Sequence, residues 1–179
     1  AIGNVNISTN SIVSNFNANN YFNLYKYFNP TTSWEFKTKF IPVTQTAWQK
    51  LNGSFADFGC GFSLGLSSTN AIQFEATTSG TTWEINLVSE LVVENDIEYW
   101  VKVGWTGTKY YLSVSTDGEN YITTETESSS PIIAKQNILI GRTWGTDNYW
   151  WRGSIDLSAT EIVVDGSSWW QPNIVQTYD

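Results

Sequence analysis

The feature that most restricts the fold is a series of short runs in which apolar and polar residues alternate. Residues 33–40 read S-W-E-F-K-T-K-F, with aromatic side chains on one face and charged side chains on the other. This period of two is typical of a half-buried β-strand. The same alternation recurs at 62–66, 72–76, 83–87, 98–105, 109–115 and 121–125, and the runs 137–140, 153–157 and 161–164 complete the set of predicted strands. Turn signals separate several of these runs, namely Thr106-Gly107-Thr108, Asp117-Gly118 and Asp165-Gly166. The pattern predicts an all-β protein built as an antiparallel sandwich or barrel.

The length of the chain fits one domain. Its 179 residues are enough to bury a core without disulfides or metals, and no repeat of fixed period divides them. We therefore predict a single domain over 1–179. Because the chain contains no Met, we expect it to be part of a longer protein, with 172–179 as the start of a linker. Three stretches lack alternation and are predicted to be loops, at 8–20, 44–55 and 143–149.

The charge of the chain excludes several partners. The formal net charge is −8, and the nine Lys and Arg residues are scattered singly. A surface that binds nucleic acid or an anionic membrane needs clustered cations. No apolar run approaches the roughly 18 residues of a membrane span. We expect neither a nucleic-acid partner nor membrane insertion.

The sequence is poor in catalytic side chains. It has no His, so a Ser-His or Cys-His pair cannot form. Cys60 is the one cysteine, and its place between Gly59 and Gly61 favours a buried structural role. A zinc site would need ligands that are absent. These absences indicate that the protein is not an enzyme and needs no catalytic cofactor.

The ten tryptophans divide by their position within the alternating runs. Three share a face with aliphatic neighbours and are predicted to lie in the core: Trp34, Trp105 and Trp151. One of Trp169 and Trp170 is expected to cover the edge of the core, and Trp83 to lie at a strand start near the rim. Trp100 has the opposite parity to its apolar neighbours and is predicted to point outward. Three others lie in or beside the predicted loops: Trp48, Trp144 and Trp150.

The C-terminal third resembles a known family. The run Trp151-Arg152-Gly153-Ser154-Ile155-Asp156-Leu157 is similar to a signature near the end of concanavalin A-like lectin/glucanase domains of the laminin-G-like type. Residues 161–166 with the following Trp pair, the hairpin over 99–118 and the run 33–36 carry the likeness upstream. Similar domains occur in bacteriophage structural and tail proteins and in bacterial surface proteins. The resemblance implies a two-sheet antiparallel jelly roll, with ligands on the concave sheet or on the loops at its rim.

The candidate binding site lies in the third predicted loop. Residues 144–150 read W-G-T-D-N-Y-W and combine three aromatic rings with a carboxylate and an amide. Sugars stack their apolar C–H face on an aromatic ring, while planar polar groups bind the hydroxyls. The predicted ligand-binding residues are Trp144, Trp150, Tyr149, Asp147, Asn148, Arg142, Trp48 and Trp100. An alternative is that these aromatic residues fold onto the sandwich as a lid or contact a neighbouring domain.

Two further alternatives concern chemistry at the rim. Glucanases of this fold use paired carboxylates on one strand, and the nearest string here, from Glu84 to Glu90, has Asn86 where an assisting Asp belongs. Glu125 and Glu127 share a face but run into a Ser-rich turn. These acids are predicted to be solvated, which argues against a glycoside hydrolase. The resemblance also implies a possible structural calcium site, with Asp147 and Asn148 as donors.

Together these observations predict a non-catalytic carbohydrate-binding domain of a phage adhesion or cell-surface protein. It would recognise a cell-surface glycan or a polysaccharide, in an extracellular setting or at a virion surface, beside neighbouring domains of a larger protein. A structural or decorating interaction domain that binds no glycan is the principal alternative.

Overall fold

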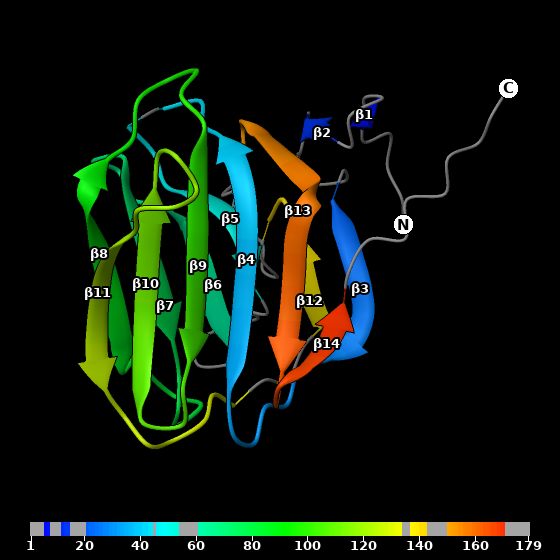
Figure 1. Ribbon diagram of the computed structural model, residues 1–179, viewed down its shortest axis with the longest axis vertical. Coiled ribbons are helices and arrows are strands. Elements are labelled where there is room, and N and C mark those ends of the chain that lie inside the picture. The colour runs from blue at the N-terminus through cyan, green and yellow to red at the C-terminus, as the bar shows by residue number, and fades with distance from the viewer. Residues whose placement is uncertain are drawn as a thin grey trace, which may run out of the picture.

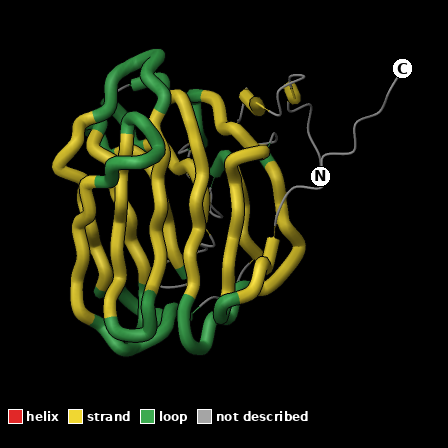
Figure 2. The backbone as a smooth tube through the Cα atoms, in the orientation of Figure 1, coloured by secondary structure: helices red, strands yellow, loops and turns green. Residues whose placement is uncertain are grey.

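The protein is a sandwich of two antiparallel β-sheets. The computed structural model describes residues 6–7, 12–14, 21–44, 46–53, 61–133, 137–142 and 150–170. Within these ranges the chain forms fourteen strands and no helix (Figures 1 and 2). No described segment has the helical length and hydropathy that crossing a bilayer would require. The predicted all-β sandwich is therefore confirmed.

The sheet facing the viewer in Figure 1 has eight strands. Its central hairpin is the one predicted from the sequence, with Tyr110 opposite Trp105 and Val114 opposite Val101. The strands follow in the order β1 (Asn6–Ile7), β2 (Ile12–Ser14), β13 (Ser154–Val164), β4 (Trp34–Ile41), β9 (Tyr99–Trp105), β10 (Lys109–Ser115) and β11 (Ile122–Glu127), with β14 (Ser167–Trp170) also paired to β13.

The second sheet lies behind the first and has six strands. Its strands follow in the order β3 (Phe22–Tyr27), β12 (Asn137–Ile140), β5 (Gln49–Gly53), β6 (Phe62–Leu66), β7 (Ala71–Ala76) and β8 (Ile85–Val92). At one side of the sandwich the edge strands of the two sheets meet, where the Thr124 hydroxyl on β11 donates to the Val88 carbonyl on β8 at 3.5 Å.

The core lies between the two sheets because alternate residues of each strand point inward. Strand β4 shows this plainly, with buried and half-buried residues in strict alternation. Aromatic rings fill the centre: Trp34 lies 5.1 Å from Phe28 and 5.0 Å from Phe62, measured between ring centres. The tryptophans predicted to be in the core are all buried: Trp34, Trp105 and Trp151.

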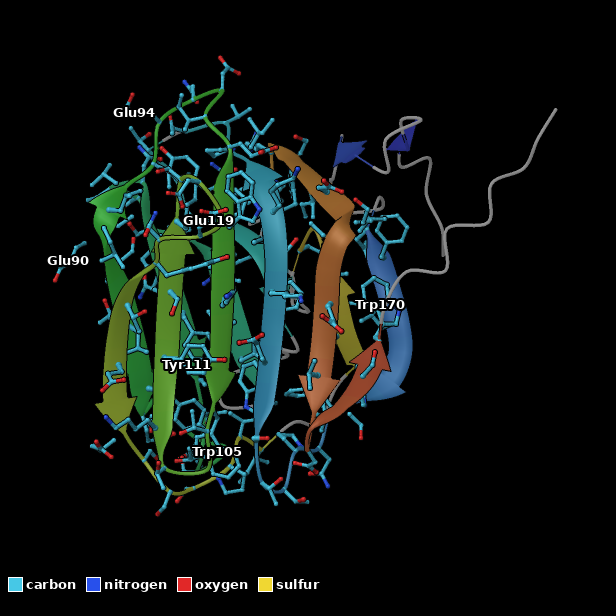
Figure 3. The ribbon with its side chains drawn as sticks, in the orientation of Figure 1. Glu90, Glu94, Trp105, Tyr111, Glu119 and Trp170 are labelled. Carbon is cyan, nitrogen blue, oxygen red and sulfur yellow. The ribbon has the colours of Figure 1, made fainter. Side chains whose placement is uncertain are left out.

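The C-terminal hairpin differs from the prediction at its tryptophan pair. Both Trp169 and Trp170 are half-buried against the core, whereas one was expected, and Figure 3 shows Trp170 on β14. The register explains this, since Trp170 pairs with Ile162 while Ser168 pairs with Val163, which leaves Trp169 as an extra residue. A bulge of this kind interrupts the alternation of faces. Trp169 accordingly lies 5.6 Å from Phe28, with the two rings nearly perpendicular.

Four strands were not predicted from the sequence, namely β1, β2, β3 and β5, and two predicted runs form a single strand. The stretch 44–55 was predicted to be a loop, but β5 occupies Gln49–Gly53 and pairs with β6 and β12. It has a single aliphatic residue, Leu51, so no alternation is visible. Strand β2 likewise lies within the stretch 8–20 that was predicted to be irregular. The runs 153–157 and 161–164 are one long strand, β13, whose pairing with β4 shifts register between Asp156 and Glu161.

A glycine allows β5 to approach β6 closely. A Cβ placed on Gly65 would lie 1.9 Å from the Gln49 carbonyl oxygen, nearer than any non-bonded contact permits. The register between the two strands shifts immediately afterwards, between Lys50 and Asn52. Only a residue without a side chain permits this approach. Gly65 therefore sets the position of β5, the strand on which the candidate site is built.

Candidate functional site

Strand β5 and the residues beside it form the described part of the candidate site. Trp48 directly precedes the strand and is half-buried, and Lys50 shares the outward parity. Gln49 and Leu51 point inward and are fully buried. The Gln49 side chain donates to the Val43 carbonyl at 2.6 Å and accepts from the Arg152 backbone N–H at 3.0 Å. A buried amide thus ties the segment around Arg152 to β5.

The two ends of the predicted binding loop are both fixed against this strand. The Gly141 N–H donates to the Leu51 carbonyl at 2.7 Å, and the Trp151 N–H donates to the Gly141 carbonyl at 2.8 Å. Trp150 also forms a parallel β-bridge with Lys50. These bonds bring Trp150 and the position following Gly141 beside β5. Trp48 directly precedes β5 in the chain, and Trp150, about a hundred residues later in sequence, lies beside the same strand.

Cationic side chains lie over the aromatic rings of the site. The Lys50 ammonium is 5.1 Å from the ring centre of Trp48, and the Arg152 guanidinium carbon is 5.3 Å from that of Trp150. Arg142 lies 5.1 Å from the ring of Tyr21. A cation over an indole face is attracted by the ring quadrupole. The site therefore pairs flat apolar surfaces with hydrogen-bond donors.

A polar row continues from Lys50 across the outer face of the six-stranded sheet. The Lys50 ammonium binds Oε2 of Glu75 at 3.0 Å. Nε2 of Gln73 donates to Oε1 of Glu75 at 3.3 Å and to Oδ1 of Asn86 at 2.8 Å. The alternation around Phe74 had already predicted that these polar residues face outward. Their closeness to Trp48 could not be predicted, because β5 was expected to be a loop.

The structure brings together only some of the predicted binding residues. Trp48 and Trp150 lie at β5, and Arg142 directly follows Gly141, which is bonded to that strand. Four others lie outside the described residues: Trp144, Asp147, Asn148 and Tyr149.

Trp100 is separated from this group because it belongs to β9 of the eight-stranded sheet. The Lys39 ammonium lies 5.6 Å from its ring centre. Its ring also lies under the β10–β11 turn, where a Cβ on Gly118 would come within 3.0 Å of it. The outward parity of Trp100 is as predicted, but its outward face is that of the other sheet.

The carboxylates weighed as hydrolase residues have structural contacts. Glu84 accepts hydrogen bonds from Ser79, from the Thr82 hydroxyl at 2.5 Å and from the Thr78 N–H at 2.9 Å. Burial acts to raise the pKa of Glu84, but these bonds outweigh it and lower the pKa to about 2. A general acid needs a carboxyl group whose pKa is raised.

The second acid pair is also engaged. Glu125 and Glu127 bind the Lys109 ammonium, at 2.5 Å and 3.3 Å. No group of three or more potential metal-ligating His, Cys, Asp or Glu residues occurs within the described ranges. Cys60 lies outside them, as do the proposed calcium donors Asp147 and Asn148, so the calcium site stays a prediction.

The architecture defines a concanavalin A-like jelly-roll domain, which confirms the resemblance seen in the sequence at the level of the fold. No protein-family model matches the sequence, and no curated protein matches it. Solved structures with the same fold include the CBM40 domain of the Ruminococcus gnavus IT-sialidase bound to α2,3-sialyllactose. That domain has a TM-score of 0.60 and 16% identity, over 81% of this chain and 86% of the other.

Two further structures place the fold in different settings. Domains LG4-5 of the mouse laminin α1 chain match with a TM-score of 0.54 and 11% identity, over 90% of this chain and 46% of the other. The enzymatically active domain of tailspike protein 2 from bacteriophage CBA120 matches with a TM-score of 0.52 and 8% identity, over 89% of this chain and 25% of the other. At these identities the likeness concerns the fold alone.

Proposed function

We propose that the protein is a non-catalytic carbohydrate-binding module whose site lies at strand β5. The observation that carries this proposal is that two half-buried tryptophans lie at Lys50: the Lys50 ammonium is 5.1 Å from the ring centre of Trp48, and Trp150 forms a β-bridge with Lys50. Sugar recognition needs an accessible apolar ring face with polar groups beside it. Lys50, Arg152 and Glu75 supply those polar groups.

We propose that the remaining predicted residues belong to the same site. Trp144, Asp147, Asn148 and Tyr149 lie in sequence between Arg142 and Trp150, whose neighbourhood is bonded to β5. We assign Trp144 and Tyr149 to stacking. Asp147, Asn148 and Arg142 would form hydrogen bonds with sugar hydroxyls. Trp100 is not part of this site.

The biological setting follows from the fold and the site together. One neighbour is a CBM40 domain bound to a sialylated sugar and another is a phage tailspike domain. These names support a glycan ligand and an extracellular or virion-surface location for this chain. The module would be one domain of a longer protein.

Intrinsic tryptophan fluorescence tests the proposal. Titration with cell-surface glycans and polysaccharides should shift or quench the emission of the wild-type protein. Trp48→Ala and Trp150→Ala should each weaken binding about fivefold to 150-fold, because each removes a stacking surface worth about 1–3 kcal/mol in comparable aromatic contacts. Trp100→Ala is the matched control, since Trp100 is equally half-buried but lies on the other sheet. Equal loss in all three variants would contradict the site.

A protein-contact role is a second candidate, favoured by exposed aliphatic side chains at one end of the sandwich. Strands β4 and β8 end there, and β9 and β11 begin there (Figure 1). The exposed residues at these strand ends are Val43, Val92, Ile97 and Ile122. Exposed apolar side chains at one end of a domain are a feature of interaction surfaces. Self-association in sedimentation experiments that is abolished by Val92→Lys, without any response to glycans, would favour this role.

A further inference from the structure

One end of the sandwich carries exposed aliphatic side chains among acidic ones. It consists of residues 90–98 and 116–122, which include the β8–β9 loop and the β10–β11 turn, and is here called the β8–β9 end. We propose that this end docks a segment of another protein that carries lysine or arginine residues beside aliphatic ones. The inference goes beyond the proposed function, because none of these residues belongs to the glycan site at β5.

Strand pairing brings the two parts of the β8–β9 end together. Trp100, near the start of β9, is directly opposite Ser115 at the end of β10. A Cβ on Gly118 would lie 3.0 Å from the Trp100 ring, so the β10–β11 turn lies against the residues that follow the β8–β9 loop. Strand β8 ends on the side of the sandwich where β11 begins (Figure 1). The loop and the turn therefore lie at the same end of the molecule.

The charged residues of the β8–β9 end are all acidic. They are Glu90, Glu94, Asp96, Glu98, Asp117 and Glu119, and neither part contains Lys or Arg. Lys39 pairs with Glu98 at 3.2 Å. The ion pairs within the described residues include none of the exposed carboxylates Glu90, Glu94, Asp96 and Glu119. Figure 3 shows Glu90 and Glu94 at the periphery of this end. Such a group of carboxylates attracts a cationic partner.

Aliphatic side chains lie among these carboxylates. Val92 is 58% exposed, Ile122 49% and Ile97 43%, and together they are half of the large hydrophobic side chains that are exposed among the described residues. Apolar surface in water is unfavourable, by about 25 cal/mol per Å². A partner that neutralised the carboxylates but offered no apolar side chains would leave this surface in water. The partner segment is therefore expected to carry aliphatic residues as well as cations.

Two other occupants fit the β8–β9 end less well. A second copy of this chain would bring the same carboxylates against each other, and its net charge of −8 adds to the repulsion. A glycan would need an open ring face, but both rings at this end are half-buried and partly covered. The turn at Gly118 lies over Trp100, and the Lys102 ammonium is 4.0 Å from the ring centre of Tyr121. A basic protein segment satisfies both the charge and the apolar surface.

Fluorescence anisotropy of a labelled peptide tests the proposal on the whole chain. The probe is a short peptide in which lysine alternates with leucine and valine, capped at both ends. It should bind the wild-type protein saturably at low ionic strength and more weakly as salt is added, because salt screens the carboxylates. Two control peptides have glutamate in place of lysine, or glycine in place of the aliphatic residues. Each should bind about tenfold more weakly or worse, because the first is repelled and the second makes no apolar contact.

Matched substitutions show whether the β8–β9 end is the place of binding. Glu94→Lys should weaken binding of the lysine–leucine peptide about fivefold to tenfold, since a reversed charge replaces an attraction with a repulsion. Glu127→Lys is its control, because it changes the net charge equally at the other end of β11. Ile97→Ser should weaken binding about fivefold through lost apolar contact. Ile133→Ser should not, because Ile133 is also exposed but lies at the opposite end, where its N–H donates to the Thr77 carbonyl just after β7.

Equal weakening by Glu94→Lys and Glu127→Lys would indicate a response to net charge alone and would overturn the proposal. So would equal affinity for the lysine–glycine peptide, or no binding of the lysine–leucine peptide even without added salt. Self-association of the wild type that Val92→Lys abolishes would identify a second copy as the occupant and also overturn it. Glycan titrations of Glu94→Lys and Ile97→Ser should match the wild type, so this proposal and the glycan site can fail independently. Urea denaturation confirms that each variant is folded.

Discussion

The Lys50 ammonium on β5 binds the Glu75 carboxylate on β7 at 3.0 Å, across the intervening strand β6. Both side chains are largely buried, with 12% and 16% of their surface exposed. The bond spans β6 at the close approach that Gly65 makes possible. It links the aromatic end of the candidate site to the polar row, so its loss should affect both stability and binding.

Lys50→Met should lower the free energy of unfolding by about 2 kcal/mol, because the Glu75 carboxylate is left without its cation. Adding Glu75→Gln should recover part of that loss, since the uncompensated charge is then removed. Urea denaturation at neutral pH measures both variants. Losses that simply add in the double variant would show that the two residues do not interact.

Trp150 and Trp151 are adjacent in sequence but have different roles. Trp151 is fully buried, with its ring 5.1 Å from that of Phe40, so Trp151→Ala should cost roughly 3–5 kcal/mol of stability. Trp150 is half-buried, and Trp150→Ala should cost less than about 1 kcal/mol while it weakens glycan binding. Thermal unfolding and fluorescence titration on the same samples separate the two effects. A large stability loss in Trp150→Ala would show that this ring is part of the core.

Gly65→Ala should be unusually damaging for a change of one methyl group. Its Cβ would meet the backbone of β5, which cannot give way as a side chain can. As for other substitutions that overpack a protein interior, we expect a loss of several kcal/mol in stability, or no folded protein. Gly166→Ala is the contrasting variant, because nothing lies within 4 Å of its Cβ position. Its cost should come from its positive φ of 77° alone and be close to 1 kcal/mol.

Acid should destabilise the protein in part through Asp165. Hydrogen bonds from the Thr32 N–H, the Thr31 hydroxyl and the Ser33 N–H hold the pKa of Asp165 well below its usual range. In the unfolded chain an Asp titrates near 3.9. Because the folded-state pKa is the lower one, this contribution is complete above about pH 4 and is lost as the pH falls below it.

The urea midpoint of the wild type should therefore fall between about pH 4 and pH 2. The fall should be smaller in Asp165→Asn, which has no carboxylate to protonate and is less stable at pH 7. Part of this fall should remain in Asp165→Asn, because the pKa of Asp117 is also lowered. The main cause is a hydrogen bond from the Asn120 side chain. Identical pH profiles for wild type and variant would contradict the role given to Asp165.

Glu84 should be dispensable for any chemistry. Glu84→Gln weakens the acceptor that holds Ser79, Thr82 and the Thr78 N–H, so we expect a modest loss of stability, on the order of 1 kcal/mol. Glycan binding should be unchanged. No reducing sugar should be released by either protein, as measured over long incubations with the bound polysaccharide. Release by the wild type that Glu84→Gln abolishes would restore the hydrolase alternative.

The residue pattern predicted the strands whose two faces differ in polarity. Strand β4 alternates strictly and the β9–β10 hairpin alternates over part of its length, and the structure confirms the predicted inward faces. Strand β5 was missed because Q-K-L-N-G contains one aliphatic residue, and its inward-facing Gln49 is polar. The Gln49 side chain can be buried because the Val43 carbonyl and the Arg152 N–H satisfy it. Val43 lies 6 residues before Gln49 and Arg152 lies 103 residues after it, so the local pattern of the strand reveals neither contact.

The burial of Trp34, Trp105 and Trp151 was determined by the sequence alone, since a period of two fixes the side of a strand on which each side chain lies. Which exposed residues are neighbours was decided only by the tertiary structure. Trp48 precedes β5 and Trp150 is bridged to Lys50 of that strand, whereas Trp100 lies on the other sheet, because strand order depends on pairings between residues far apart in the chain. Such pairings follow from backbone hydrogen bonds and core packing, which local sequence does not encode.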